Sequence, residues 1–221
     1  MNGSVLFSLR LSLQVALIAT FFVIIVGVCI AYLLARKDFK GRELIDSLVT
    51  LPLVLPPTVT GYYLIILFGK SGFIGKHLFA WTGWNIMFTW YAAVLASFVV
   101  ALPLMIKTAR AAIESVDKNL INTSCTLGRS EVETVFKVIL PLSGKGLVAG
   151  AVLSFARAMG EFGATLMLAG NIPGRTDTMP LAIYTLANSG DRSGAHIMVL
   201  IFTVISGLFL YISNRFAMRT V

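Results

Sequence analysis

Two charged residues stand four positions apart in a stretch that is otherwise apolar. Arg157 and Glu161 lie within 146–168, which we expect to cross a membrane. A charge near the middle of a bilayer costs about 3 kcal/mol or more on insertion scales, and side chains at i and i+4 meet on one helix face. The pair is therefore either a structural ion pair that fixes helix packing or part of an anion path or cytoplasmic gate. Gly160 and Gly163 would permit close helix contact, or closure of a twofold subunit interface.

Prolines interrupt a second apolar stretch. Pro52, Pro56 and Pro57 each lack a backbone donor and disfavour a straight helix. In lipid the freed carbonyl groups need partners, so such breaks normally face protein or a watery path. Thr58 and Thr60 supply hydroxyl groups directly after the break. The segment is either a pathway or gate helix that bends between states, or a static kink.

Potential metal ligands are few and scattered. His77 and His196 have no cluster of Cys or carboxylate residues near them, and Cys29 and Cys125 are far apart in the chain. Zinc sites need three or four such ligands at characteristic spacing. We therefore predict neither a metal site nor a disulfide.

Nucleotide-binding and catalytic patterns are missing as well. A phosphate-binding loop needs G-x-x-x-x-G-K-S/T, but Leu64 stands where Gly69-Lys70-Ser71 would require its first glycine. Gly75-Lys76-His77 lacks both the first glycine and the hydroxyl residue. No apolar stretch pairs an interior His with a Ser or carboxylate, as an intramembrane enzyme would need. We expect no catalytic residue and no cofactor bound by this chain.

The elements that position these residues must be membrane helices. The chain has 221 residues, of which 57% are hydrophobic and 13% charged, and its mean hydropathy is +0.86. Soluble domains carry about 25% charged residues, so an ordinary cytosolic enzyme, a disordered protein and a coiled coil are excluded. We predict an all-α polytopic membrane protein with one domain over 1–221. About 20 apolar residues span a bilayer, which gives five expected spans at 11–35, 48–68, 84–106, 146–168 and 195–213.

The basic charge indicates orientation rather than nucleic-acid binding. The net charge is +8, and 12 of the 18 Lys and Arg residues fall in 36–42, 107–145 and the C-terminal tail. Basic loops stay on the cytoplasmic side. We therefore predict a multi-pass protein of the cytoplasmic (inner) membrane, in contact with membrane lipid, with its N-terminus outside and its C-terminus in the cytoplasm.

The segment 107–145 is the longest polar stretch. Asp117 can cap a short helix over 118–127, and Gly128 can end it. The side chains expected near one face of this helix are Leu120, Thr123, Ser124 and Leu127.

A second short helix should follow within the same segment. Ser130-Glu131-Val132-Glu133 matches a capping box, and Pro141 closes the unit. An amphipathic stripe at i, i+3, i+4 and i+7 is formed by Val132, Val135, Phe136 and Ile139. Together the two helices are either a docking surface or a hairpin that merely packs on the bundle.

This segment resembles the EAA loop of ABC-importer permeases. The spacing is met by Asn122-Thr123-Ser124, then Gly128, then Val138, Leu140 and Pro141, although Asn122 stands at the Glu position of that pattern. In such permeases the loop is a coupling helix that sits in a groove of an ATPase subunit. The residues that the resemblance assigns to coupling are Asp117, Leu120, Asn122, Thr123, Ser124, Leu127, Gly128, Leu140 and Pro141.

The resemblance extends along nearly the whole chain. The stretches 51–63, 155–176 and 179–184 look like the molybdate branch of these permeases, and sulfate permeases share the Ala-Arg-x-x-Gly-Glu-Phe-Gly core. The resemblance implies an ABC type I importer permease fold. It also implies three kinds of partner, namely a second copy of the chain, two ATP-binding cassette subunits and an extracytoplasmic oxyanion-binding protein. An outer loop with Asn171, Pro173, Gly174 and Arg175 would face that binding protein.

Energetics favour an ATP-driven importer. A divalent oxyanion entering a cell that is negative inside climbs about 4.6 kcal/mol per 100 mV. The resemblance implies that the transported anion is molybdate, or else tungstate, moved by alternating access with ATP and Mg used by the partner subunit. Import of sulfate, thiosulfate or another oxyanion is the alternative. An intramembrane enzyme would turn over substrate alone, and a channel would conduct without an ATPase.

Overall fold

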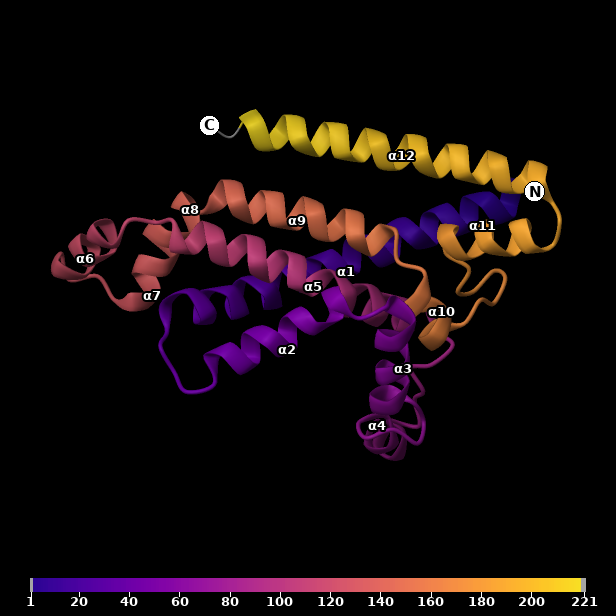
Figure 1. The fold of residues 1–221 in the computed structure, drawn as a ribbon, viewed down its shortest axis with the longest axis horizontal. Helices are drawn as coiled ribbons and strands as arrows, with labels where there is room; N and C mark the ends of the chain where they lie inside the picture. Colours follow the sequence, from indigo (N-terminus) through magenta and orange to yellow (C-terminus); the bar gives the residue numbers. More distant parts are fainter. Residues whose placement is uncertain (1, 220–221) are drawn as a thin grey trace.

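The centre of the molecule is a layer of long helices that lie side by side. The computed structural model describes residues 2–219, and every regular element in that range is helical. Helices α1 (Asn2–Arg36), α5 (Trp90–Glu114) and α9 (Gly144–Met159) pack along one another, as Figure 1 shows.

Two helices joined by a sharp bend leave this layer. Helix α2 (Arg42–Val54) runs beside α5. Between α2 and α3 (Pro57–Phe68) the chain bends by 119°. A short helix α4 (Gly75–Thr82), which the sequence analysis did not anticipate, lies at the far end of α3 (Figure 1). The α3–α4 unit therefore projects from the body.

Four short elements form one end of the molecule. They are α6 (Lys118–Thr126), α7 (Glu131–Thr134), the π-helical turn η1 (Val135–Ile139) and α8 (Leu140–Leu142). Figure 1 places them toward the end where α1 finishes, and the last turns of the final helix point the same way.

Near the opposite end lie α10 (Gly163–Ala169), the loop after it and α11 (Met179–Asn188). The last helix, α12 (Arg192–Arg219), then runs back along α9 (Figure 1). It is peripheral, because only 11% of the residues in its most apolar 18-residue stretch are buried.

The helices differ from the expected spans in ways that have local causes. Three described helices are long and apolar enough to cross a membrane, and up to five spans result if two bent pairs each count as one. The range 146–168 is not one helix, because α9 ends at Met159 and α10 starts at Gly163. Helix α5 starts at Trp90 rather than near residue 84, because the Thr89 side chain caps it by accepting from the Ala92 amide.

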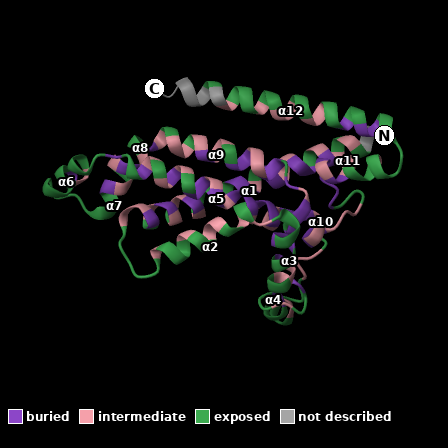
Figure 2. Ribbon diagram, viewed as in Figure 1, coloured by how far each residue is buried: buried purple, intermediate pink, exposed green. Residues whose placement is uncertain are grey.

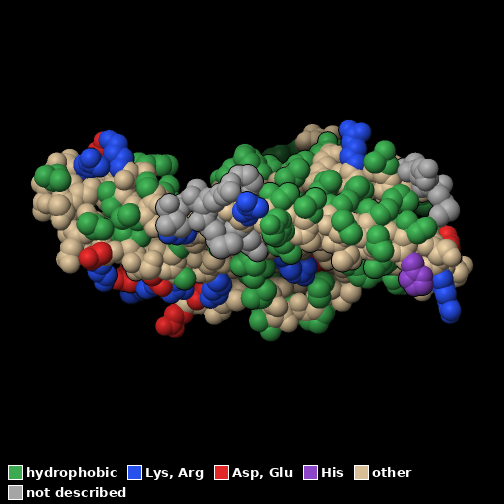
Figure 3. All heavy atoms as spheres, turned by 90° about the horizontal axis from the view of Figure 1, so that it is seen from above, with side chains coloured by type: hydrophobic (Ala, Val, Ile, Leu, Met, Phe, Trp, Pro, Cys, Tyr) green, Lys and Arg blue, Asp and Glu red, His purple; other side chains and the backbone are tan. Residues whose placement is uncertain are grey.

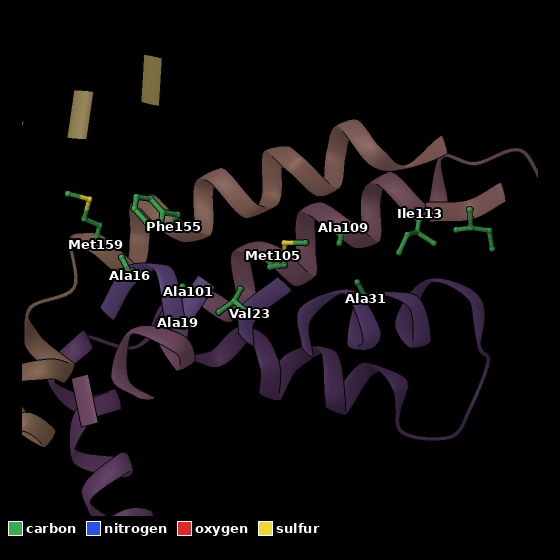
Figure 4. Close-up of a cluster of buried hydrophobic side chains, with 12 residues drawn as sticks. Ala16, Ala19, Val23, Ala31, Ala101, Met105, Ala109, Ile113, Phe155 and Met159 are labelled. Atoms are coloured by element: carbon green, nitrogen blue, oxygen red, sulfur yellow. The ribbon is translucent and has the colours of Figure 1, made fainter. Parts of the chain in front are cut away.

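The core between α1, α5 and α9 is built from small residues. Ala16, Ala19 and Ala101 are fully buried, and Met105 and Phe155 fill the remaining space, as Figure 4 shows. Small residues allow helices to approach closely where lipid provides no hydrophobic drive. In Figure 2 the buried positions concentrate in this layer and around α10, while α4, α6 and much of α12 are exposed.

The surface has two kinds of region. On the face shown in Figure 3, hydrophobic side chains cover much of the body, and charged side chains of both signs gather toward the end that carries α6 and α7. A contiguous apolar surface is expected where a protein meets lipid. The polar end and the apolar body are therefore separate along the long axis.

Candidate functional site: a helix joint and a docking segment

The bend between α2 and α3 follows from two adjacent prolines. Helix α2 ends at Val54, and Leu55 already has an extended backbone. Pro56 then precedes α3, with Pro57 at its first position, where a missing N–H costs nothing. The Pro56 carbonyl accepts from the amides of Val59 and Thr60 at 2.9 and 3.1 Å. The predicted break is thus confirmed, and the Pro56 carbonyl at the break accepts the first hydrogen bonds of α3.

A second break separates α9 from α10. The backbone leaves the helix at Gly160, and the buried carboxylate of Glu161 follows with 3% exposure. Its Oε1 accepts from the Ala164 amide at 2.7 Å, which caps α10. Its Oε2 lies 2.9 Å from Nη1 of Arg157, but without the alignment of a hydrogen bond. The predicted pairing of these two charges is therefore seen, at a helix end rather than along a continuous helix.

The two breaks meet. A Cβ placed on Gly163 would lie 3.0 Å from the Pro57 side chain and 3.2 Å from the Thr58 amide nitrogen. A Cβ on Gly61 would lie 2.7 Å from Met167 Cβ and 2.9 Å from Ala164 Cα. Both glycines thus let α3 and α10 touch at backbone distance. We call α3, α10 and the residues 160–162 the joint.

The predicted pathway residues, which lie in or directly beside the joint, differ in their exposure. Glu161, Gly163 and Thr60 are buried, and the Thr60 hydroxyl has no hydrogen-bond partner. Arg157 keeps 29% of its side chain exposed. The exposed members are Pro56, Pro57, Thr58 and Gly160. Contrary to one expectation, Gly160 makes no close helix contact, since a Cβ there would meet only the Ala156 carbonyl, at 3.6 Å.

The polar segment at the other end begins with α6. The side chain of Asp117 caps it by accepting from the Asn119 amide at 2.8 Å. At its end, Gly128 has a φ of +82°, and the amides of Gly128 and Arg129 donate to the carbonyls of Cys125 and Ser124 at 3.0 and 3.3 Å. This pattern is a Schellman motif. Both helix boundaries predicted from the sequence are confirmed.

Helix α7 starts with the predicted capping box. Ser130 Oγ accepts from the Glu133 amide at 3.2 Å, and the Glu133 carboxylate accepts from the Ser130 amide at 3.1 Å. A buried hydroxyl contact of 2.9 Å between Ser124 and Thr134 joins α7 to α6. Ser124 is therefore a structural link inside the segment and not part of its free surface.

The segment 117–142, which we call the docking segment, leaves large apolar side chains uncovered. They are Leu120 at 50%, Leu127 at 76%, Val132 at 65%, Phe136 at 66% and Leu142 at 56%. The predicted stripe over α7 and η1 thus splits, because Ile139 is buried in the core while Val132 and Phe136 face outward. Val132 and Phe136 were not among the predicted coupling residues. Of those residues, Asp117, Asn122, Thr123, Gly128 and Pro141 are exposed and Leu140 is half-buried.

A polar clasp ties the docking segment to α1. The Tyr32 hydroxyl donates to Glu131 Oε1 at 2.9 Å, and Lys37 Nζ lies 2.5 Å from the same oxygen. The Lys37 ammonium, followed by the Tyr32 hydroxyl, holds the pKa of Glu131 below its usual range. Sequence reasoning missed this clasp because its partners are 99 positions apart in the chain.

The loop after α10 is built around a buried carboxylate. Asp177 accepts from the Gly174 amide at 2.9 Å and from the Ser8 hydroxyl of α1 at 3.2 Å. The tip residues Pro173, Gly174 and Arg175 are exposed, and Asn171 donates to Thr185 of α11 at 2.5 Å. The predicted outer loop is therefore a fixed structure with an accessible tip.

The scattered His and Cys residues stay apart in the fold. His77, His196, Cys29 and Cys125 are all exposed. Within residues 2–219 no group of three or more His, Cys, Asp or Glu side chains could hold a metal ion.

Comparison with known proteins gives relatives along almost the full length. The chain is 44% identical over 208 residues to the molybdenum transport system permease protein ModB of Escherichia coli K12, covering 94% of this chain and 91% of that protein. It is 43% identical to the putative molybdenum transport system permease protein YvgM of Bacillus subtilis, covering 91% and 88%. It is 32% identical to the sulfate transport system permease protein CysT of Salmonella typhimurium, covering 100% and 80%.

The fold also has a solved counterpart. A chain in an inward-facing structure of the MetNI methionine ABC transporter matches with a TM-score of 0.78 at 17% identity, covering 100% of this chain and 98% of that one. At such low identity the match shows the fold alone, which is that of ABC type I importer permeases. The family model for binding-protein-dependent transport system inner membrane components matches residues 24–220. Because this match covers most of the chain, the chain belongs to this family of multi-pass inner-membrane permease components.

Proposed function

We propose that the chain is the permease subunit of an ATP-driven importer that moves molybdate or tungstate across the cytoplasmic membrane by alternating access. The observation that carries this proposal is the exposed docking segment on a permease fold whose relatives at 42–44% identity are named as molybdenum permeases. Two copies of the chain would surround a central path.

The docking segment would seat the ATPase subunits. Leu120, Leu127 and Phe136 offer apolar anchors, of the kind that dominate protein interfaces when they enter a partner's pocket. The clasp to α1 and the direct chain connections to α5 and α9 would pass movement of the segment on to the bundle. ATP and Mg would be bound by the ATPase, and this chain would hold no cofactor.

The orientation follows from the positions of the basic segments. The residues 36–42, the docking segment and the end of α12 lie toward one end, and the N-terminus lies toward the other (Figure 1). With basic loops on the inner side, the docking segment faces the cytoplasm. The tip at 173–175 then faces outward, where an oxyanion-binding protein could contact it.

The joint would be the gate. Arg157 is partly exposed beside the breaks, so its guanidinium could meet an oxyanion as the path opens. The glycine contacts between α3 and α10 would let these helices move together while the bundle of α1, α5 and α9 stays packed.

The decisive experiment is reconstitution of the chain with its ATPase and binding protein in proteoliposomes. We expect ATP hydrolysis and uptake to rise with binding protein loaded with molybdate or tungstate. A rise with sulfate-loaded protein alone would instead favour sulfate transport, in line with the similarity to CysT. Ion currents without an ATPase, or peptide turnover by the chain alone, would overturn the proposal.

A further inference from the structure

We propose that Glu161 is a positioning residue of the transport cycle: by accepting the Ala164 amide, its carboxylate fixes where α10 starts, and thereby where α3 sits against the bundle. This inference rests on the proposed function and deepens it, because it names the group that places the gate. It differs from a simple ion-pair role, in which the charge of Arg157 would be the essential partner.

The first step is the geometry of the carboxylate. Oε1 makes an aligned bond of 2.7 Å to the Ala164 amide, whereas Oε2 faces Arg157 at 2.9 Å without hydrogen-bond alignment. A buried amide without an acceptor costs more than a poorly aligned ion pair contributes when one partner is part-exposed. Phe162, which directly precedes α10, offers no side-chain cap. The amide bond is thus the stronger constraint on the start of α10.

The second step is what the capped residue touches. Ala164 is the residue whose Cα would lie 2.9 Å from a Cβ on Gly61. Gly163, next to it, faces Pro57 and Thr58 at the first turn of α3. Backbone contacts this close leave no slack, so a shift of the first turn of α10 must shift α3 with it.

The third step concerns the non-helical link between α9 and α10, in which the Glu161 amide donates to the Ala158 carbonyl of α9 at 3.3 Å. Residues 160–162 are not helical, and a Cβ on Gly160 would meet only the Ala156 carbonyl, at 3.6 Å. Helix α10 also packs on α5, and the Phe88 amide donates to the Leu168 carbonyl at 3.2 Å. That bond holds the far end of α10, while Glu161 holds its first turn. The carboxylate therefore sets the tilt of α10 between these two fixed ends.

The test compares three variants of the full chain in lipid nanodiscs without nucleotide. Glu161→Gln keeps an oxygen acceptor and loses the charge. Glu161→Ala loses both, and the double variant Arg157→Glu, Glu161→Arg restores opposite charges but supplies no acceptor at position 161. Spin labels at Ile66 of α3 and Leu153 of α9, both exposed, report the position of α3. A second pair at Leu17 and Leu153 reports the bundle and serves as control.

We expect Glu161→Gln to keep the wild-type distance distribution for the α3–α9 pair, and uptake within about threefold of wild type in the reconstituted importer. The Ala and charge-swap variants should broaden that distribution and lower uptake by about tenfold or more, since a buried amide loses its acceptor. The control pair should stay unchanged. If the Ala variant fails to fold, the Gln and charge-swap variants still distinguish a capping role of Glu161 from an ion-pair role.

Two results would overturn the inference. One is a charge swap that restores both the distance and uptake, which would make the ion pair the essential feature. The other is a Gln variant that loses the α3 position although the bundle pair is unchanged. Because the distances are measured without nucleotide or substrate, they do not depend on transport. Failure of the wild-type importer to move molybdate would contradict the proposed function, but it would not affect the conclusion drawn from the distances.

Discussion

The joint and the docking segment are held in place by opposite means. In the joint, Gly61 and Gly163 let backbones touch, and one buried carboxylate satisfies the amide at the break. In the docking segment, the polar side chains of Asp117, Ser130 and Glu133 fix the helix ends. The joint is therefore positioned by close backbone contact and one buried carboxylate, and the docking segment by several polar side chains at its helix ends.

The difference reflects the two surroundings. Inside a membrane no water replaces a lost hydrogen bond, so a break must be packed tightly and capped from within. At a polar end, caps can form in water and leave apolar side chains such as Leu127 and Phe136 free. The joint should thus be sensitive to added side-chain volume, and the docking segment to a change of charge or polarity at its exposed side chains.

The largest effect should come from adding volume to the joint. Gly61→Ala places a methyl group 2.7 Å from Met167 Cβ and 2.9 Å from the Ala164 backbone. Overpacking of this kind costs about 1–3 kcal/mol or more, so we expect a lower melting temperature in detergent and loss of uptake. Gly207→Ala in α12 is the matched control, because a Cβ there would meet nothing within 4 Å. A Gly61→Ala protein that melts and transports like wild type would show that α3 and α10 are not this close.

The next effect concerns the docking segment and should spare the fold. Phe136 is 66% exposed, so Phe136→Glu should leave the melting temperature of the isolated chain unchanged. If Phe136 is an interface anchor, its loss should weaken ATPase binding by about 30-fold or more, as measured by titration in nanodiscs. Phe73→Glu, at an 83% exposed Phe outside the segment, is the control. Equal ATPase affinity for wild type and Phe136→Glu would remove η1 from the proposed interface.

A smaller, local effect should follow from loss of the capping box. Ser130→Ala removes the acceptor of the Glu133 amide, which typically costs about 1 kcal/mol of helix stability. We expect amide hydrogen exchange at Glu133 to quicken by about fivefold, with no change in the bundle. Ser189→Ala, which removes a hydroxyl bonded to the Leu186 carbonyl at the other end of the molecule, should not affect that amide. Unchanged exchange at Glu133 would mean that tertiary contacts alone hold α7.

The smallest effect should be that of the clasp. The pKa of Glu131 lies below its ordinary value of 4.5, so the stability that it contributes is fully present at neutral pH and is lost as pH falls through the folded-state pKa. Glu131→Gln should therefore lower the melting temperature slightly at neutral pH, and the difference from wild type should vanish in acid. The side chains are exposed, so high salt should reduce the effect too. A difference that grows on acidification would contradict this assignment.

Sequence reasoning succeeded where a feature depends on neighbouring residues. The Asp117 cap, the left-handed Gly128 and the Ser130–Glu133 box follow from local residue types, and the structure has them all. The break before Pro57 follows likewise from proline geometry.

It failed where a feature depends on tertiary contact. Nothing in the local sequence indicates that Gly61 meets Ala164. The expectation of one continuous helix over 146–168 therefore missed the second break. The acceptor role of Glu161 depends on that break, and the spacing to Arg157 suggested only a pair along one helix. For the stripe that holds Val132 and Phe136, docking and packing both stayed open, because periodicity cannot tell which neighbour will cover which side chain.

Helix α1 has a further consequence, for the order in which the protein matures. Its Ser8 hydroxyl donates to Asp177 as well as to the Ser4 carbonyl, and its Ser12 hydroxyl accepts from the Met179 amide. Its Arg36 donates to the carbonyls of Ile113 and Val116. Chains emerge from the ribosome N-terminus first, so α1 enters the membrane long before residues 177–179 exist. The first helix to be made is thus among the last to be completed, and a chain truncated before residue 177 would leave its polar face open to the quality-control machinery of the cell.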